Sequence, residues 1–339
     1  MRSLNKLILS IILISSFYTF LKGQSFRWQA GLNGFFDNRE YQTPYAESQT
    51  MFGTRMFGYA NLKLNREIDI GTGLDMLYEF GDELRKNNLK PVLYLHFNKE
   101  FVDFIFGSFP RRNLIVPPRM LLSDTIQYYR PNCEGLYLKL NQSWGFQSVW
   151  LDWTSRQGDT IREVFQIGGT GMAWKGVLYY RHDFIMTHYA KPSNQMLNTT
   201  IRDNGGLYAG VGVNLSPYLF DSLTISTGLC FSYDRIRDVT DLTYSHGSLT
   251  NLYIEVFHIG IRTSTYVGTG QVLMWGDRLY RAKYYNRLDL IWYFFRKKNI
   301  TGSVEFSIHV VEDILDVSQI LKIHATIGDE YKIRLRQTN

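Results

Sequence analysis

The sequence predicts an all-β fold, a single antiparallel up-and-down transmembrane β-barrel of about 16 strands, with an error of about two strands. Three observations predict it. Polar and apolar residues alternate along most of the chain. After residue 23 there is no apolar run of the roughly 20 residues that a membrane helix needs. Short and long connections between the alternating segments follow one another in turn.

The segment 91–109 shows the alternation most clearly. Leu93, Leu95 and Phe97 fall on one side of an extended chain, and Tyr94 and His96 fall on the other. A period of two is the pattern of a strand with one apolar face. A tight polar turn then leads into a second run of the same kind, which predicts a hairpin. We expect the apolar faces to meet lipid and the polar faces to meet water inside the barrel.

Composition and charge agree with this class of fold. The 339-residue chain is 15% aromatic and holds 28 Gly but only 8 Pro, as expected of a membrane β-barrel. Arg2, Lys6 and Lys22 are three of its 37 basic residues, so the chain after residue 23 keeps 34 basic and 31 acidic residues, a net charge of +3. That balance does not favour nucleic-acid binding.

The first 23 residues have the pattern of a secretory signal peptide. Arg2 and Lys6 precede a mostly apolar run at residues 7–21, and Gly23 before Gln24 is a cleavage point. An uncleaved anchor is the alternative. The barrel is therefore expected to span residues 24–339.

The expected strands follow in chain order, each justified by alternation between apolar and polar residues. Their ranges are 26–36, 49–64, 68–80, 91–97, 101–109, 134–140, 144–153, 162–173, 177–189, 207–215, 223–231, 249–267, 271–275, 285–295, 303–310 and 320–335.

The connections between these strands alternate in length. Short ones are expected near Asn65, Asn98, Asn141, Trp174, Ser216, Gly268 and Arg296, and long ones near Asp37, Gly81, Pro110, Ser155, Ala190, Asp234, Asp277 and Val311. Short periplasmic turns and longer external loops are typical of outer-membrane barrels.

The long segment 110–133 differs from every other connection. It has four prolines and no period of two, yet it is rich in Leu, Ile, Met and Tyr. Loops of this length in a compact domain are usually functional or disordered, and the apolar content favours packing over disorder.

At this point the chain resembles the porin-like outer-membrane β-barrels of Gram-negative bacteria. The segments 35–41 (FFDNREY) and 48–53 (SQTMFG) resemble a Bacteroidetes-type barrel of that kind. The resemblance implies the cell outer membrane as location, outer-membrane lipids and the barrel-assembly machinery as partners, and leaves a further outer-membrane protein partner open. One departure is that many such barrels end on an aromatic residue, whereas this chain ends at Asn339.

Basic residues in and near the Pro-rich segment are the candidate binding site. If this segment folds into the lumen, its arginines form an anion-attracting constriction, as rings of basic side chains do in anion pores. Arg55 faces inward by its position in the alternation. The alternative is that the arginines pair with lumen carboxylates such as Asp69, Asp75, Glu79 and Asp103. The candidate residues are Arg55, Arg111, Arg112, Arg119 and Arg130.

The expected function is passive diffusion of small polar or weakly anionic solutes. One alternative is a closed barrel that acts as a structural or assembly partner, with residues 110–133 as plug or docking surface. Another is a soluble secreted β-protein whose apolar faces form a core.

No motif points to catalysis, to a cofactor or to a metal, so an enzyme is not expected. Gly168–Gly171 lacks the Lys of a phosphate loop, and the seven His show no paired ligand spacing. An outer-membrane lipase or protease remains the alternative, and its mark is a His within reach of Ser or Asp at the external rim. Cys133 and Cys230 either form a disulfide or are two buried thiols.

Overall fold

The computed structural model describes residues 25–83, 88–194, 199–216 and 220–329. In this part of the chain sixteen antiparallel strands close into a barrel, as predicted. The strands are β1 (Phe26–Glu40), β2 (Gln49–Lys63), β3 (Ile68–Glu79), β4 (Leu89–Lys99), β5 (Val102–Pro110), β6 (Asn132–Gln142), β7 (Gly145–Ser155), β8 (Val164–Lys175), β9 (Leu178–Tyr189), β10 (Arg202–Asn214), β11 (Ser222–Ile236), β12 (Thr243–Val256), β13 (Ile259–Gly268), β14 (Tyr284–Lys297), β15 (Ile300–Val311) and β16 (Ile314–Gly328).

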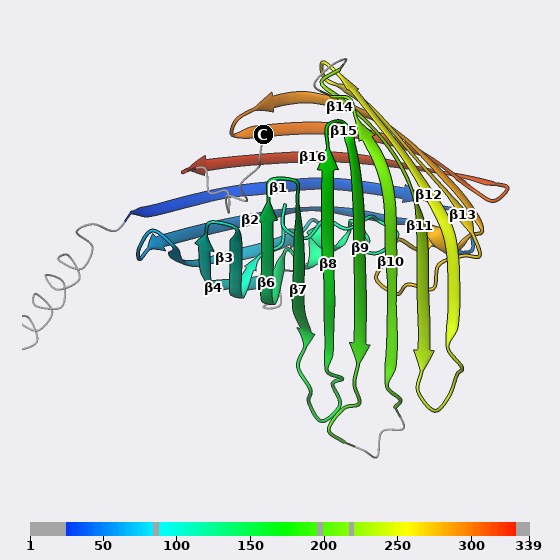
Figure 1. Cartoon of the computed structure of the whole chain (residues 1–339), viewed down its shortest axis with the longest axis horizontal. Helices are drawn as coiled ribbons and strands as arrows, with labels where there is room; N and C mark the ends of the chain where they lie inside the picture. The colour runs from blue at the N-terminus through cyan, green and yellow to red at the C-terminus, as the bar shows by residue number, and fades with distance from the viewer. Residues whose placement is uncertain (1–24, 84–87, 195–198, 217–219, 330–339) are drawn as a thin grey trace, which may run out of the picture.

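Each strand pairs with the next one along the chain, and β1 closes the barrel by pairing with β16, where Ala30 lies opposite Ile327. In Figure 1 β8–β12 run nearly vertically, whereas β14–β16 and β1 run nearly horizontally. Opposite walls cross in this way because the strands of a barrel tilt relative to its axis.

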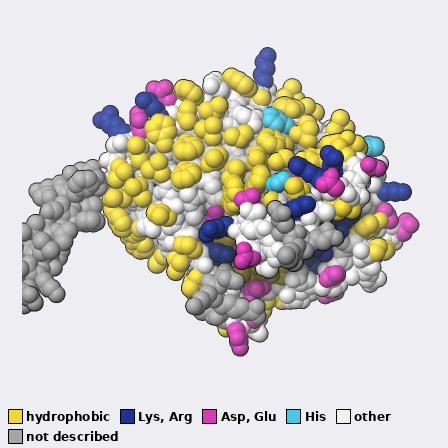
Figure 2. All heavy atoms as spheres, turned by 90° about the horizontal axis from the view of Figure 1, so that it is seen from below, with side chains coloured by type: hydrophobic (Ala, Val, Ile, Leu, Met, Phe, Trp, Pro, Cys, Tyr) yellow, Lys and Arg dark blue, Asp and Glu magenta, His cyan; other side chains and the backbone are white. Residues whose placement is uncertain are grey.

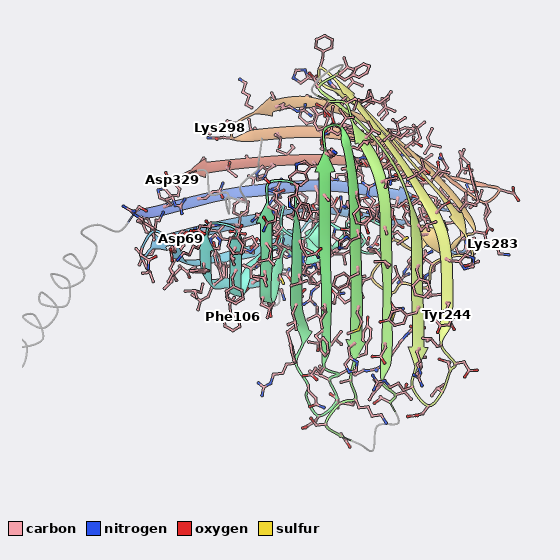
Figure 3. The ribbon with its side chains drawn as sticks, viewed as in Figure 1. Asp69, Phe106, Tyr244, Lys283, Lys298 and Asp329 are labelled. Atoms are coloured by element: carbon pink, nitrogen blue, oxygen red, sulfur yellow. The ribbon has the colours of Figure 1, made fainter. Side chains whose placement is uncertain are left out.

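The two ends of the barrel differ in their connections. Lys298 and Asp329 lie at the end with the short turns, and Lys283 and Tyr244 lie toward the opposite end (Figure 3). Long loops are external in outer-membrane barrels. We therefore call the end near Lys283 the external end and the end near Lys298 the periplasmic end.

The expected strand number is correct, but one strand was misplaced. Residues 249–267 are not one strand, because β12 and β13 turn at Phe257–His258. Residues 271–275 belong to a loop instead of a strand. The connection near Val311, expected to be long, is the two-residue turn Glu312–Asp313. Phe257 and Glu312 have φ values of 56° and 55°, the positive values that two-residue hairpin turns require.

Apolar side chains cover the outer wall of the barrel. Leu93 and Trp292 are 62% and 56% exposed, whereas Tyr94 and His96 are buried inside. The Phe106 side chain projects away from the wall in Figure 3, and Figure 2 shows hydrophobic side chains spread broadly beside clustered charged ones. The apolar faces thus form an outer surface and not a sealed common core. An apolar outer surface suits the hydrocarbon of a lipid bilayer.

The interior of the barrel is filled by two long loops. The first, residues 111–131, contains the short helix α2 (Ile126–Tyr129), and we call it the inward loop. The second, residues 269–283, contains the 3₁₀ helix η2 (Arg278–Arg281), and we call it the second loop. Both contribute to one buried apolar cluster with strand residues that face inward. Its loop members are Leu114, Ile115, Met120, Leu121, Leu122, Ile126, Leu273, Leu279, Tyr280 and Ala282.

The signal peptide expected at residues 1–23 and the chain end after Asp329 lie outside the described residues. Among the described cysteines, Cys133 and Cys230 are both free and buried, so the disulfide is not formed. No helix in the described ranges is long and apolar enough to cross a membrane.

Candidate functional site

The arginines predicted as a constriction are mostly engaged with separate partners. Arg111 pairs with Asp152 of β7, and Arg55 Nη1 lies 3.9 Å from Asp75 Oδ1. Arg130 donates from Nη2 to the Thr154 carbonyl at 3.1 Å. The contacts of Arg111 and Arg130 fasten the inward loop to β7, and Arg55 Nε fastens it to β2 by donating to the Tyr128 carbonyl at 3.2 Å. The anion-attracting role predicted for these arginines stays a prediction.

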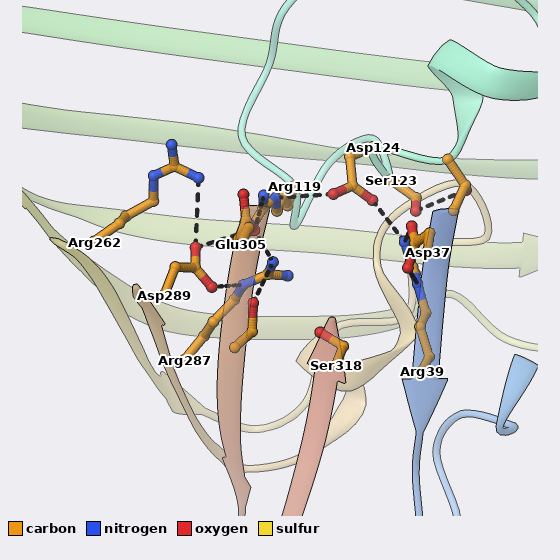
Figure 4. Close-up of polar contacts among 12 residues, drawn as sticks. Asp37, Arg39, Arg119, Ser123, Asp124, Arg262, Arg287, Asp289, Glu305 and Ser318 are labelled. Atoms are coloured by element: carbon orange, nitrogen blue, oxygen red, sulfur yellow. Dashed lines mark hydrogen bonds and ion pairs between the residues drawn. The ribbon is translucent and has the colours of Figure 1, made fainter. Parts of the chain in front are cut away.

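Arg119 is the centre of a charged network between the inward loop and the wall (Figure 4). Its guanidinium lies 3.3 Å from Asp124, 3.5 Å from Asp289 and 3.6 Å from Glu305. Asp124 is also 3.2 Å from Arg39 of β1. Burial alone would raise the pKa of Asp124, but the charges of Arg119 and Arg39 outweigh it, so this pKa lies below its usual value.

Arg112 is the member of the predicted set with an exposed side chain. Its Nη1 donates to Asn33 Oδ1 at 2.6 Å and lies 2.8 Å from His324 Nδ1. In the described part of the chain no carboxylate pairs with it. Arg112 therefore presents a positive charge to the water-accessible part of the barrel.

Among the residues that the structure describes, three histidines lie within hydrogen-bond reach of an acidic or hydroxyl side chain. His96 Nε2 is 3.3 Å from Asp103 Oδ1, but this pair lies near the short turn between β4 and β5 at the periplasmic end. The other two histidines, His309 and His188, lie near the external end. A His within reach of Ser or Asp at the external rim is the feature expected of an outer-membrane lipase or protease.

His309 belongs to an interior constellation. Its Nε2 is 2.9 Å from Ser318 Oγ, and its Nδ1 is 2.8 Å from the Tyr285 hydroxyl. This is the spacing of a nucleophile and its base. His309 is 0% and Ser318 1% exposed, and the Tyr41 ring packs edge-on against His309 at 5.4 Å. In this conformation no substrate reaches the pair.

His188 belongs to a pair on the outer wall. Its Nδ1 lies 2.7 Å from Asp203 Oδ1, and Asp203 Oδ2 accepts a 2.7 Å hydrogen bond from Arg237 Nε. The two residues stand directly opposite each other on β9 and β10, one residue from the external ends of these strands. The His188 and Asp203 side chains are 19% and 18% exposed, so the pair is accessible from outside the barrel.

The alternation of β9 places His188 on the lipid side. The neighbouring residues Thr187 and Asp183 are buried inside, and His188 lies on the opposite face of the strand. Phe165 packs against the His188 ring with a centroid distance of 5.1 Å, and Trp153 stacks on Phe165 at 5.3 Å. Aromatic girdles mark the interface between the hydrocarbon and the head groups, so the pair sits at head-group depth.

The arrangement can supply a general base. An Asp that binds Nδ1 fixes the tautomer of a His and leaves Nε2 free to accept a proton. Among the described residues no group hydrogen-bonds to His188 Nε2, and Arg237 holds the second oxygen of Asp203. We call His188, Asp203 and Arg237 the rim site.

The seven His show no paired ligand spacing in the sequence, and no sequence pattern connected His188 to Asp203. Asp203 precedes the strand expected at 207–215, so only the observed register of β9 and β10 reveals the cross-strand pair. The described residues contain no group of three or more His, Cys, Asp or Glu placed to hold a metal ion.

Several solved structures share this fold. An anion-selective porin from Comamonas acidovorans superposes with a TM-score of 0.58 at 9% identity, covering 90% of this chain and all of the porin. OmpF of Salmonella typhi superposes with a TM-score of 0.55 at 8% identity, covering 90% and 98% of the two chains. OmpT of Vibrio cholerae gives 0.54 at 8% identity, with the same coverage as OmpF. A comparison with curated proteins finds no match.

A family model described as Lipid A 3'-O-deacylase-type matches residues 22–327, which include nearly the whole barrel. A deacylase is an enzyme, so the expectation that this chain is not an enzyme is wrong. The match and the closed barrel together assign the chain: it belongs to the Lipid A 3'-O-deacylase-type family of proteins and has the architecture of outer-membrane porins.

Proposed function

We propose that this protein is an outer-membrane esterase that removes an ester-linked acyl chain from a lipid-A-type glycolipid. The observation that carries the proposal is the rim site, a His–Asp pair on the lipid side of the barrel at head-group depth. The family description supports the reaction class, because deacylation at a 3'-oxygen is ester hydrolysis. A lipid that diffuses in the outer leaflet brings its ester linkage to this depth without entering the barrel.

In the proposed reaction His188 is the general base. Its Nε2 takes a proton from a water molecule as the water oxygen attacks the carbonyl carbon of the ester. The tetrahedral intermediate collapses, the bond between the carbonyl carbon and the sugar oxygen breaks, and His188 returns the proton to that oxygen. Asp203 stabilises the imidazolium, as the acidic member of a triad does. The products are a fatty acid and a free sugar hydroxyl.

Arg237 has two roles in this proposal. It lies just beyond the external end of β11 and holds Asp203 in place through the Nε hydrogen bond. The hydrogen bond to Asp203 and the negative charge of Asp203 both raise the pKa of Arg237, so the Arg237 guanidinium stays protonated. A fixed positive charge beside the reacting ester stabilises the developing oxyanion.

The interior constellation of His309 and Ser318 is the rival site for the same chemistry. Its nucleophile-to-base distance is suitable, but both residues are sealed from solvent and from lipid. The rim site therefore requires no opening of the structure, whereas the interior site requires displacement of the Tyr41 segment.

The test uses the full-length protein reconstituted in vesicles that contain lipid A, with fatty-acid release measured by mass spectrometry. We expect His188→Asn to lower the rate about 10²- to 10⁴-fold, the usual contribution of a positioned general base. Asp203→Asn should lower it as well. His309→Asn and Ser318→Ala are the matched variants of the rival site, and they should retain the wild-type rate.

Heat modifiability on gels shows that each variant forms the barrel. Wild-type activity in a folded His188→Asn variant, or loss of activity only in folded His309→Asn, would contradict the assignment to the rim site. Absence of hydrolysis by the folded wild type would contradict the esterase proposal itself.

Passive diffusion of small polar or weakly anionic solutes is the second candidate function. The observation that favours it is the exposed guanidinium of Arg112 inside the barrel. The apolar cluster formed by the two loops opposes it, because that cluster occupies the interior. Single-channel recording of the wild type decides: stable anion-selective conductance that Arg112→Glu reverses would support diffusion, and no conductance would exclude it.

A further inference from the structure

The outer wall of the barrel contains a groove that the reaction at the rim site does not use. The groove has a volume of about 620 Å³ and is formed by β10, β11, β12 and β13. Its lining is almost entirely apolar. The lining residues are Leu207, Ala209, Leu229, Cys230, Phe231, His246, Gly247, Ser248, Val267 and Gly268.

The groove arises from the sizes of four side chains in one cross-strand row. Ala209 lies opposite Leu229, Leu229 opposite Ser248, and Ser248 opposite Val267. Small and large side chains therefore alternate around the wall. Leu229 is 73% exposed and Val267 is 52% exposed, so both stand up on either side of the small Ser248.

The floor of the groove is supported from inside the barrel. Gly247 lies beneath the groove, and a Cβ at this position would lie 2.5 Å from Cε2 of the buried Tyr266 ring. Tyr266 also accepts a 2.8 Å hydrogen bond from Gln271 of the second loop. Because this ring is packed and hydrogen-bonded, the shape of the groove is part of the folded wall.

The groove continues the lipid-facing side of the rim site toward the membrane interior. Asp203 and Leu207 are on the same face of β10, four residues apart, which is about 13 Å along a strand. Tyr233 lies between them, with its ring over Gly205. An ester bound at His188 has its acyl chain directed along this path, because the sugar remains at head-group depth.

We propose that the groove holds the acyl chain of the substrate that the rim site hydrolyses. This inference rests on the proposed function and adds a substrate preference to it. The bilayer is as apolar as the groove, so the groove supplies no hydrophobic driving force. The groove instead positions the substrate. An acyl chain that lies in the groove holds the ester against His188, and correct positioning of reacting groups can raise the rate of hydrolysis by a large factor. A butyryl chain is too short to reach the groove, whereas a fatty-acyl chain reaches it.

The first test compares p-nitrophenyl myristate with p-nitrophenyl butyrate as probes, using the full-length protein in lipid vesicles. We expect Ser248→Trp and Ala209→Trp, which fill the groove, to lower the ratio of kcat/KM for myristate to that for butyrate about tenfold. The control is Ala60→Trp, a lipid-side substitution near the periplasmic end of β2. It should leave the ratio unchanged.

The second test needs no turnover. A phospholipid with a photoreactive diazirine in its acyl chain is incorporated in the vesicles, and crosslinks are mapped by mass spectrometry. We expect wild-type crosslinks to concentrate on residues 207–209, 229–231 and 246–248 and to disperse in Ser248→Trp. Crosslinks spread evenly around the barrel would overturn the inference.

The outcomes separate this inference from the proposed function. If His188→Asn abolishes hydrolysis but both groove-filling variants keep the wild-type ratio, the groove inference is wrong and the function stands. If the folded wild type releases no fatty acid from lipid A, the proposed function is wrong, and the crosslinking result alone decides whether the groove holds an acyl chain.

Discussion

The ion pair between Arg111 and Asp152 joins the inward loop to the barrel wall in a setting almost free of solvent. Arg111 is 2% and Asp152 0% exposed. Arg111 also donates from Nε to the Arg130 carbonyl at 3.3 Å, and Asp152 Oδ1 accepts a 2.9 Å hydrogen bond from the Glu134 amide. Replacing Asp152 by Asn keeps the shape but leaves the Arg111 charge buried without a counter-ion.

The expected cost of Asp152→Asn is about 3–5 kcal/mol, the usual penalty for breaking one side of a buried ion pair. At 1.36 kcal/mol per factor of ten, this is about a 150- to 5,000-fold change in the folding equilibrium. Arg111→Met should cost a similar amount. The double variant should cost clearly less than the sum, because removing Arg111 together with Asp152 also removes the buried charge that Asp152→Asn alone leaves unpaired.

The assay is urea unfolding in detergent or lipid vesicles, followed by tryptophan fluorescence, for the wild type, both single variants and the double variant. Glu67→Gln is the control, because Glu67 pairs with Lys99 at 3.3 Å while both side chains are largely exposed. It should cost less than about 1 kcal/mol. Single variants that cost no more than Glu67→Gln, or strictly additive costs, would refute the view that this pair anchors the inward loop.

Three further predictions follow from other parts of the structure. The charges of Arg119 and Arg39 lower the pKa of Asp124 against the effect of burial. The ionised Asp124 therefore stabilises the folded protein fully above its unfolded-state pKa of about 3.9, and this contribution is lost progressively as the pH falls from there toward the lower folded-state pKa. The difference in urea midpoint between wild type and Asp124→Asn should thus be larger at pH 7 than at pH 3, and equal differences would contradict it. Gly71→Ala should destabilise the barrel by about 1–3 kcal/mol in the same assay, since its Cβ would overlap the Tyr94 ring, whereas Gly58→Ala, where a Cβ meets nothing, should be tolerated. Loss of the Trp153 ring in Trp153→Ala should weaken hydrolysis through a higher KM while kcat stays near the wild-type value, because this ring supports Phe165 beside His188 without touching the reacting atoms.

The alternation of side chains was sufficient to predict the barrel, its strand number and the face of individual residues. Arg55, for example, was expected to point inward and is 3% exposed. A period of two is a local property of the chain, so it can be read without knowing which strands pair. The positions of the hairpin turns were harder to predict from the sequence. The Gly268–Gly270 segment looked like a turn but begins the second loop, while the real turn at Phe257–His258 carries no Gly, Asn or Asp.

The candidate sites depended on information that the sequence does not display. The partners of Arg119 come from β14, β15 and the inward loop itself, and no spacing rule predicts such a meeting. His188 and Asp203 are separated by a loop, so their pairing follows only once the register of β9 and β10 is known. The groove requires the registers of four adjacent strands at once.

The sequence by itself determined that this protein is a barrel with an apolar exterior, because strand alternation and turn spacing act over a few residues. Only the tertiary structure decided that two loops fill that interior and that a His–Asp pair stands on the outer rim. Those features arise from strand register and from the closure of β1 on β16, which bring together residues that lie far apart along the chain.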